Sequence, residues 1–234
     1  EIASVLDAQA VKVWLGDGTN YPGQDDLRGR HRRLLSGLRE AYATLPARRR
    51  ARILTVTPGN LYLQAALLLD EYLEVEEATL EQAPARLREG RWDAVVFDGP
   101  AVALPTGVSA VYLRPTGPDS PLELDGASEE LATVRRPRFD RIEPRHPLTR
   151  WMSDLPDTNV GAALRYRLRE RDRALASSTD APLLIAGERR GARFVALSFD
   201  VRQSDLPLRV SWPVLLINAF DWFAGEDPAY LSSF

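Results

Sequence analysis

Residues 182–225 form the most informative segment of this sequence and read PLLIAGERRGARFVALSFDVRQSDLPLRVSWPVLLINAFDWFAG. It begins with two apolar, β-prone runs, residues 182–187 and 192–199, separated by the polar tetrapeptide Glu188-Arg189-Arg190-Gly191. A short polar turn that contains glycine, placed between two such runs, predicts an antiparallel hairpin.

The same stretch ends in an apolar segment that predicts one buried helix. Ser211 is suited to cap its start, Pro213 falls in its first turn, and Gly225 is suited to end it. Apolar residues at 212, 215, 216, 219, 222 and 223 share one helical face. A helix of about fifteen residues is shorter than the roughly twenty needed to cross a bilayer, so we expect it to pack on a sheet.

Upstream of this stretch, short apolar runs alternate with segments of helical spacing. Predicted strands cover residues 52–57, 74–78, 93–98 and 108–113, and predicted helices cover 61–73 and 81–89. Strands that alternate with helices predict an α/β fold with a parallel sheet and right-handed crossovers. Residues 115–160 are rich in proline and predict irregular chain with one short helix near 148–152, and alternation over 165–176 favours a strand.

The two ends of the chain are expected to flank this domain. Residues 1–50 predict one or two strands, from the alternating run at 10–15, and an amphipathic helix over 24–44 that packs on or leads into the main domain. The main domain is expected over 51–225, with a tail over 226–234. Because the sequence starts at Glu1 without a methionine, we expect it to be a piece of a larger protein.

Composition excludes several classes of function. The 234 residues carry a net charge of -3, which argues against a nucleic-acid binder, since such a protein needs a strongly basic face. Cysteine is absent, which removes disulfides, thiolate metal sites and cysteine nucleophiles. The two histidines, His31 and His146, lack the spacing of metal ligands, so the sequence predicts neither a metal nor a cofactor.

Candidate ligand-binding residues follow the predicted strands, because an open parallel sheet binds ligands at the carboxyl ends of its strands. They are Thr57, Gly59, Asn60, Asp98, Asp200, Ser204 and Asp205. The turn at 57–60 has a single glycine, unlike a dinucleotide fingerprint or a phosphate-binding loop, so a plain capping turn is the alternative. For Asp200, Ser204 and Asp205 the alternative is that they end a strand and shape the turn before the helix.

Several blocks of the sequence resemble a known bacterial family. They are ARILTVTPGNLYLQAALLL at 51–69, WDAVVFDG at 92–99, HPLTRW at 146–151, and FVALSFDVRQSDLPLRVSWPVLLINAFDWF at 194–223. Together they resemble the class I glutamine-amidotransferase-like domain of Bat-type aerotolerance membrane proteins, which are often associated with a von Willebrand factor A domain. The resemblance implies a three-layer, flavodoxin-like sandwich with a mostly parallel sheet and a C-terminal antiparallel hairpin.

The resemblance also implies where catalytic residues would stand. Glutamine amidotransferases place a cysteine on a strand-to-helix elbow and a histidine after a late strand. In this sequence the matching elbow reads Arg114-Pro115-Thr116-Gly117, and the late strand ends Ser198-Phe199-Asp200. Without a thiolate or an imidazole at these positions the acyl chemistry has no nucleophile or base, so we expect no enzyme activity.

Three hypotheses for function follow. The first is a non-catalytic binding or scaffold domain of a membrane-anchored bacterial envelope protein. Its partners would be proteins of a membrane-associated assembly, with no nucleic acid, and flanking helices would hold it at the inner membrane facing the periplasm. The second is a hydrolase that uses carboxylates such as Asp98 and Asp200, and the third is a sensor that binds a small ligand at residues 57–60.

Overall fold

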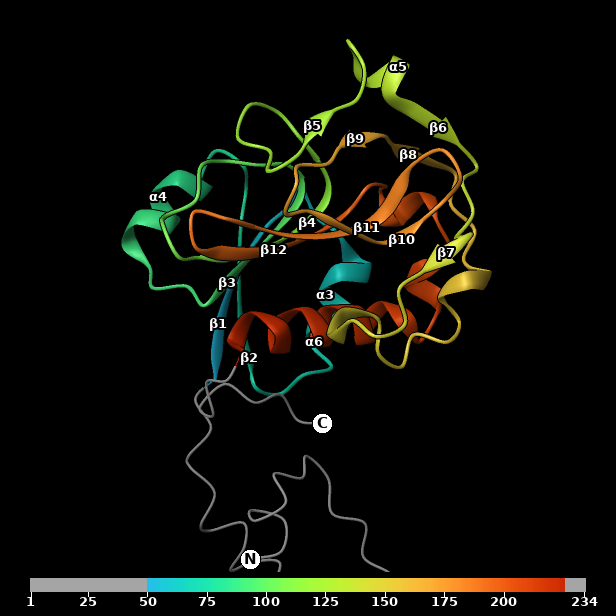
Figure 1. Ribbon diagram of the computed structural model, residues 1–234. Coiled ribbons are helices and arrows are strands. Elements are labelled where there is room, and N and C mark those ends of the chain that lie inside the picture. Colours follow the sequence, from blue (N-terminus) through green and yellow to red (C-terminus); the bar gives the residue numbers. More distant parts are fainter. Residues whose placement is uncertain (1–49, 226–234) are drawn as a thin grey trace, which may run out of the picture. The chain divides into compact units, whose positions relative to one another are not determined.

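The computed structural model describes residues 50–225, and an eight-stranded sheet organises them (Figure 1). The strand predicted at 10–15, the helix predicted at 24–44 and the tail at 226–234 lie outside these residues. The large sheet contains β1 (Ala51–Val56), β2 (Leu73–Ala78), β3 (Ala94–Pro100), β4 (Ser109–Thr116), β7 (Arg141–Ile142), β10 (Arg173–Ser177), β11 (Pro182–Arg189) and β12 (Ala192–Leu197). The main helices are α3 (Leu61–Leu67), α4 (Ala83–Glu89) and α6 (Ser211–Ala224).

The sheet confirms the predicted fold class. Its order is β2-β1-β3-β4-β12-β11-β10-β7, with parallel pairing from β2 to β12 and antiparallel pairing from β12 to β7. Residues of α3 and α6 pack on one face, whereas residues of α4 pack on the other, which makes three layers (Figure 1). The fold is therefore an α/β, flavodoxin-like sandwich. Between the parallel strands β1 and β3 the order in which strands are added to the sheet reverses, which makes this the topological switch point.

The predicted hairpin is β11 and β12, and its turn is tighter than the tetrapeptide suggested. Arg189 pairs with Ala192, which leaves only Arg190 and Gly191 in the loop. Both take positive φ, 52° and 76°, as a two-residue type I′ turn requires. Glu188 and Arg189 therefore continue β11 instead of belonging to the loop.

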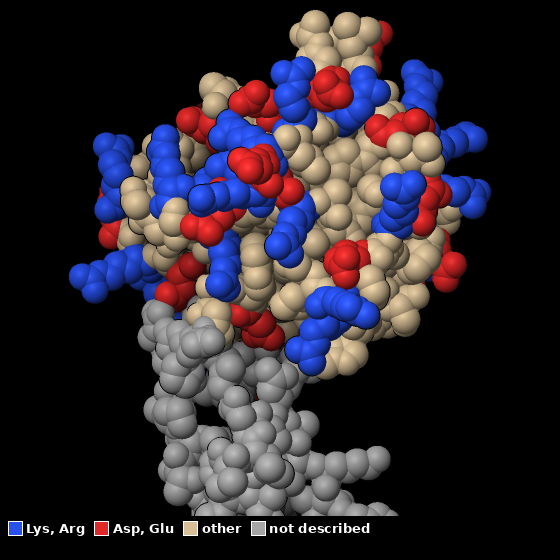
Figure 2. All heavy atoms as spheres, viewed as in Figure 1, with Lys and Arg blue, Asp and Glu red and all other residues tan. Residues whose placement is uncertain are grey.

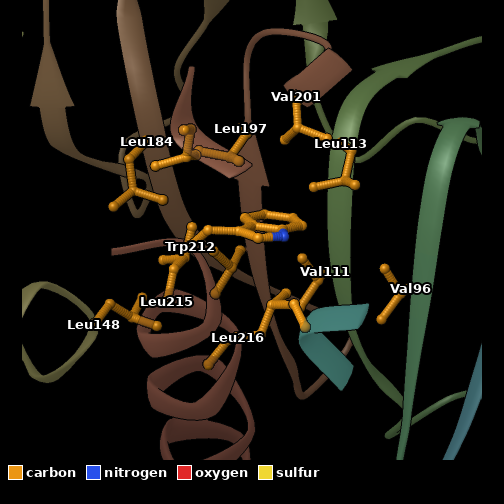
Figure 3. Packing of buried hydrophobic residues seen from close by; sticks show 14 of the residues in the cluster. Val96, Val111, Leu113, Leu148, Leu184, Leu197, Val201, Trp212, Leu215 and Leu216 are labelled. Atoms are coloured by element: carbon orange, nitrogen blue, oxygen red, sulfur yellow. The ribbon is translucent and has the colours of Figure 1, made fainter. Parts of the chain in front are cut away.

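Helix α6 forms the centre of the larger hydrophobic cluster. Trp212, Leu215 and Leu216 point from it toward Val111, Leu113 and Leu197 of the sheet (Figure 3). The indole N–H of Trp212 donates to the Tyr62 carbonyl at 2.9 Å, so the largest side chain of this core also ties α6 to α3. The buried helix and its packing on the sheet are thus confirmed.

The predicted cap of α6 was wrong in one respect. Ser211 is already the first helical residue, and Val210 occupies the cap position without a side-chain hydrogen bond. The capping acceptor is Asp154, which accepts the Val210 N–H at 3.0 Å and the Ser211 hydroxyl proton. A carboxylate from a distant segment thus accepts hydrogen bonds at the start of the helix, where a neighbouring side chain normally does so. Gly225 ends the helix with φ 63°, as predicted.

Other local predictions also needed correction. Helix α3 ends at Leu67 instead of near residue 73, because Asp70 is buried and accepts the Tyr72 N–H at 2.9 Å in a turn. The strand predicted over 165–176 is split into β9 (Tyr166–Arg167) and β10. The short helix expected at 148–152 is a 3₁₀ turn, Pro147–Thr149, whose start is capped by the His146 ring nitrogen.

Smaller elements complete the structure and pack on both faces of the sheet. Two small antiparallel sheets pair β5 (Glu123–Leu124) with β9, and β6 (Thr133–Arg135) with β8 (Ala162–Leu164). The remaining elements are α5 (Glu129–Ala132) and 3₁₀ turns at Leu155–Asp157, Val201–Gln203 and Leu206–Leu208.

Candidate functional site

The candidate site lies at the carboxyl ends of β1 and β3, where Thr57 and Asp98 meet. Val56 of β1 pairs with Phe97 of β3, so the residue after each of them comes to the same edge of the sheet. The Thr57 hydroxyl donates to Asp98 Oδ2 at 2.9 Å and accepts the Gly59 N–H at 3.0 Å. Topology therefore brings together residues that stand 41 positions apart in the sequence.

Asn60 joins this contact from the start of α3. Its Oδ1 accepts the Leu63 N–H at 3.2 Å, which caps the helix, and its Nδ2 donates to Asp98 Oδ2 at 3.3 Å. Gly59 takes φ 113°, a conformation that side chains disfavour, and so turns the chain into α3. The turn at 57–60 is thus a capping turn that also holds a carboxylate.

Arg202 is the residue that sequence reasoning missed. Its Nη2 lies 3.4 Å from Asp98 Oδ1 and its Nε 2.9 Å from Asp200 Oδ1, so one guanidinium joins both carboxylates. The hydrogen bond to Asp200 and the charge of Asp98 raise the pKa of Arg202 above its usual range, although burial opposes the shift. Asp200 also accepts the Arg202 N–H at 2.9 Å, a local turn that the spacing Asp-x-Arg could have indicated.

Ser204 and Asp205 make their polar contacts away from this cluster. The Ser204 hydroxyl donates to the Val201 carbonyl at 2.9 Å and accepts the Leu206 N–H at 3.3 Å. Asp205 accepts hydrogen bonds from Arg209 and Asn159, and these bonds lower its pKa below the usual range. Both residues shape the turn before α6, which was the alternative interpretation of their sequence.

A cavity of about 350 Å³ opens beside Asp98. Its lining residues come from the ends of β1 and β3 and from the segment that leads from β2 into α4: Val56, Thr57, Pro58, Thr79, Leu80, Glu81, Asp98 and Pro100. Among residues 50–225, no group of three or more histidine, aspartate or glutamate side chains is placed to hold a metal ion.

At the two positions that the amidotransferase pattern would use, the described part of the chain does not form the features of such an enzyme, a nucleophile on a strand-to-helix elbow and a histidine after a late strand. Strand β4 continues through Thr116, and the next helix, α5, begins only at Glu129, so the expected elbow at 114–117 is not a strand-to-helix turn. His146 packs its ring on Trp222, with 5.5 Å between centroids. Trp222 lies ten residues, or about 15 Å of helix, beyond Trp212 at the start of α6.

No helix among the described residues has the length and apolar character needed to cross a membrane.

Comparisons with known proteins support the fold only. No protein-family description matches the chain. Two structures of cytoplasmic proteins from Salmonella typhimurium superimpose with TM-scores of 0.53 and 0.51. Each covers 74% of this chain and 98 to 99% of its own, at 12% and 11% identity. A ThuA-like protein from Parabacteroides merdae covers 76% of this chain and 91% of its own, at 13% identity and a TM-score of 0.46.

Two curated sequences match a short part of the chain. They are probable sugar isomerases of Rhizobium meliloti and Mesorhizobium japonicum, 41% identical over 46 residues and 43% identical over 47 residues. The match spans 20% of this chain and only 11% of the length of each curated protein. What these comparisons and the site define together is a flavodoxin-like α/β domain with a polar cluster at its switch point. None of these matches bears on the Bat-type family, which stays a prediction.

Proposed function

We propose that this chain is a non-catalytic binding domain of a bacterial envelope protein, with its ligand site at the carboxyl ends of β1 and β3. The observation that supports the proposal best is that the Asp98 carboxylate is buried and hydrogen-bonded. Its side chain is 2% exposed and accepts hydrogen bonds from Thr57, Asn60 and Arg202, so it is fixed in place and charge-paired. Such a carboxylate serves as a rigid acceptor in a binding site better than as a group that must gain and lose protons.

The chemistry available around the site favours binding over turnover. The sequence contains no cysteine, and His146 lies near the far end of α6. A nucleophile and base for acyl transfer would therefore have to come from residues other than those that the amidotransferase pattern uses. On the face shown in Figure 2, acidic side chains lie among the basic ones, which agrees with a partner other than nucleic acid.

The envelope location and the protein partners in this proposal rest on the resemblance to Bat-type proteins. In that arrangement two hydrophobic helices precede the domain, and the positively charged loop between them stays in the cytoplasm. The domain would then face the periplasm. A reporter that is active only in the cytoplasm, fused after Phe234 to a chain that ends there and carries its native preceding segments, should stay silent, and a strong signal would contradict this location.

A turnover assay tests the non-catalytic part of the proposal. Purified protein should release no ammonia from glutamine and should cleave no amide or ester substrate above the buffer rate. The matched variants are Asp98→Asn, at the site, and Asp180→Asn, on an exposed turn. Turnover that is lost in Asp98→Asn and kept in Asp180→Asn would refute a purely binding role.

One observation favours a second candidate, a carboxylate-dependent hydrolase. Asp98 and Asp200 contact the same guanidinium, so the two carboxylates lie in one neighbourhood, as a pair that shares a water must. Arg202 holds both of them through charge-assisted hydrogen bonds, which stabilises their ionised forms and opposes a role as proton donor. If Asp98→Asn and Asp200→Asn each abolished a measured hydrolysis, this candidate would replace the first.

A further inference from the structure

The cavity beside Asp98 presents hydrogen-bond acceptors to whatever enters it. Asp98 already accepts three hydrogen bonds and its side chain is 2% exposed, so it contributes mainly negative charge. Glu81 is exposed and makes no hydrogen bond or ion pair with the described residues. The Thr57 hydroxyl proton is already donated to Asp98. The unused hydrogen-bonding capacity of these lining side chains is therefore mainly that of acceptors.

The charge of the cavity is negative. Glu81 and Asp98 line it, and none of its lining residues is lysine or arginine. Arg202 offsets one carboxylate, but it binds Asp98 and Asp200 together, so these three groups keep a net negative charge. An anion entering the cavity would meet carboxylates with no lining cation to pair with, which is unfavourable.

The remaining walls are aliphatic. Val56, Pro58, Leu80 and Pro100 surround the polar groups. A volume of about 350 Å³ falls at the lower end of ligand sites, which hold roughly 300 to 1,000 Å³. The features usual for phosphate at a switch point are missing, because the turn has one glycine and α3 is only seven residues long.

We propose that the cavity formed by Thr57, Glu81 and Asp98 binds a small aliphatic amine in its ammonium form. The ammonium group would donate to the exposed Glu81 carboxylate, the buried Asp98 carboxylate would add negative charge to the cavity, and the hydrocarbon chain would lie against the aliphatic walls. This inference rests on the proposed binding function and adds the class of ligand.

The test is a titration of the whole chain followed by the backbone amide signals of Thr57, Leu80 and Glu81 in ¹H–¹⁵N NMR spectra at neutral pH. The probes are n-butylammonium, the neutral 1-butanol and the anion butyrate, which are similar in size and differ in charge. We expect saturable shifts of these amides with n-butylammonium. Glu81→Gln should weaken binding about fivefold, the change that an exposed ion pair of about 1 kcal/mol gives. Glu130→Gln, a change on the exposed surface of α5, should leave binding unchanged.

The other outcomes overturn the inference. Tighter binding of butyrate at the same amides would show that the cavity prefers anions. Equal binding by Glu81→Gln and the parent, or no shift with any of the probes, would exclude an ammonium site that uses Glu81. Each of these results is separate from the turnover assay, which alone decides whether the domain is catalytic.

Discussion

The two faces of the large sheet are covered in different ways. We call the face under α3 and α6 the helical face, and the face under α4 and residues 122–124 and 164–168 the mixed face. On the helical face, large side chains of α6 fill the space above the strands (Figure 3). On the mixed face, irregular chain covers much of the sheet and is attached to it by hydrogen bonds.

Three polar contacts show how the mixed face is held. The Tyr166 hydroxyl donates to the Pro115 carbonyl at 2.7 Å, and the Trp92 indole N–H donates to the Arg86 carbonyl at 2.9 Å. Arg189 binds Asp172 with two bonds of 2.7 and 2.8 Å. Each of these contacts comes from a polar side chain and joins two elements: Tyr166 joins β9 to β4, Trp92 binds the end of α4, and Arg189 joins β11 to the segment before β10.

The largest expected effect follows from removing a side chain at the centre of the helical face. Leu216→Ala should lower the free energy of unfolding by roughly 2 to 5 kcal/mol, because the helix cannot collapse fully into the cavity that forms. Leu122→Ala, on the mixed face, should cost less, because irregular chain can adjust around the gap. Denaturant unfolding measures both values, with Leu208→Ala, 81% exposed, as the near-neutral control. Equal losses at Leu216 and Leu122 would remove the distinction between the faces.

A smaller effect is expected from removing the ion pair between Arg189 and Asp172 on the mixed face. Arg189→Met keeps an unbranched aliphatic side chain but removes the guanidinium, which lies over the Phe194 ring. The fully buried Asp172 carboxylate then loses its charged partner. Because Arg189 itself is partly exposed, we expect a loss of about 2 kcal/mol, below the full value for a buried pair. Arg171→Met, at an exposed position, is the control. If both variants melt at the parent temperature, the ion pair does not hold this face.

The smallest effect concerns pH at the edge of the helical face. Burial and the charge of Arg173 lower the pKa of His146 in the folded state, with Glu143 opposing them. The unfolded chain then binds more protons than the folded one below about pH 6.5, so the free energy of unfolding should fall as pH drops from 7 to 5. His146→Asn keeps a cap acceptor for the Leu148 N–H and should reduce this slope.

Unfolding curves at several pH values give the slopes of the parent and the variant. A steeper fall in His146→Asn than in the parent would show that His146 does not contribute in this direction.

The hairpin and α6 are the parts of the fold that the sequence predicted best. The hairpin turn needs a glycine at positive φ, and α6 needs apolar residues at helical spacing, and both requirements are visible over a few residues at 182–225. The irregular chain of the mixed face was predicted poorly. Residues 115–160 show no period that indicates their contacts, and the alternation over 165–176 did not indicate which strands they pair with. Partners such as Pro115 and Tyr166 stand 51 positions apart.

Some residues of the candidate site could likewise be predicted from the sequence, and others could not. Thr57, Asn60 and Asp98 could be named from sequence, because polar residues that follow parallel strands must gather at one edge of a sheet. Arg202 escaped notice because arginines are frequent in this chain. Its spacing from Asp200 could indicate the local turn, but not the contact with Asp98, 104 residues away. Ser204 and Asp205 are close in sequence to Asp200 and Arg202, yet their side chains make hydrogen bonds within the turn before α6 and not with Asp98.

The amino-acid sequence was enough to predict the parallel strands, the hairpin, the buried helix and the edge of the sheet where polar residues collect, because each depends on residue spacing within a short segment. That Asp154 caps α6 and that Arg202 joins Asp98 to Asp200 became visible only in the folded structure. Those contacts link segments 56 and 104 residues apart. A side chain's partner over such a separation is fixed by how the layers pack, and no local pattern encodes it.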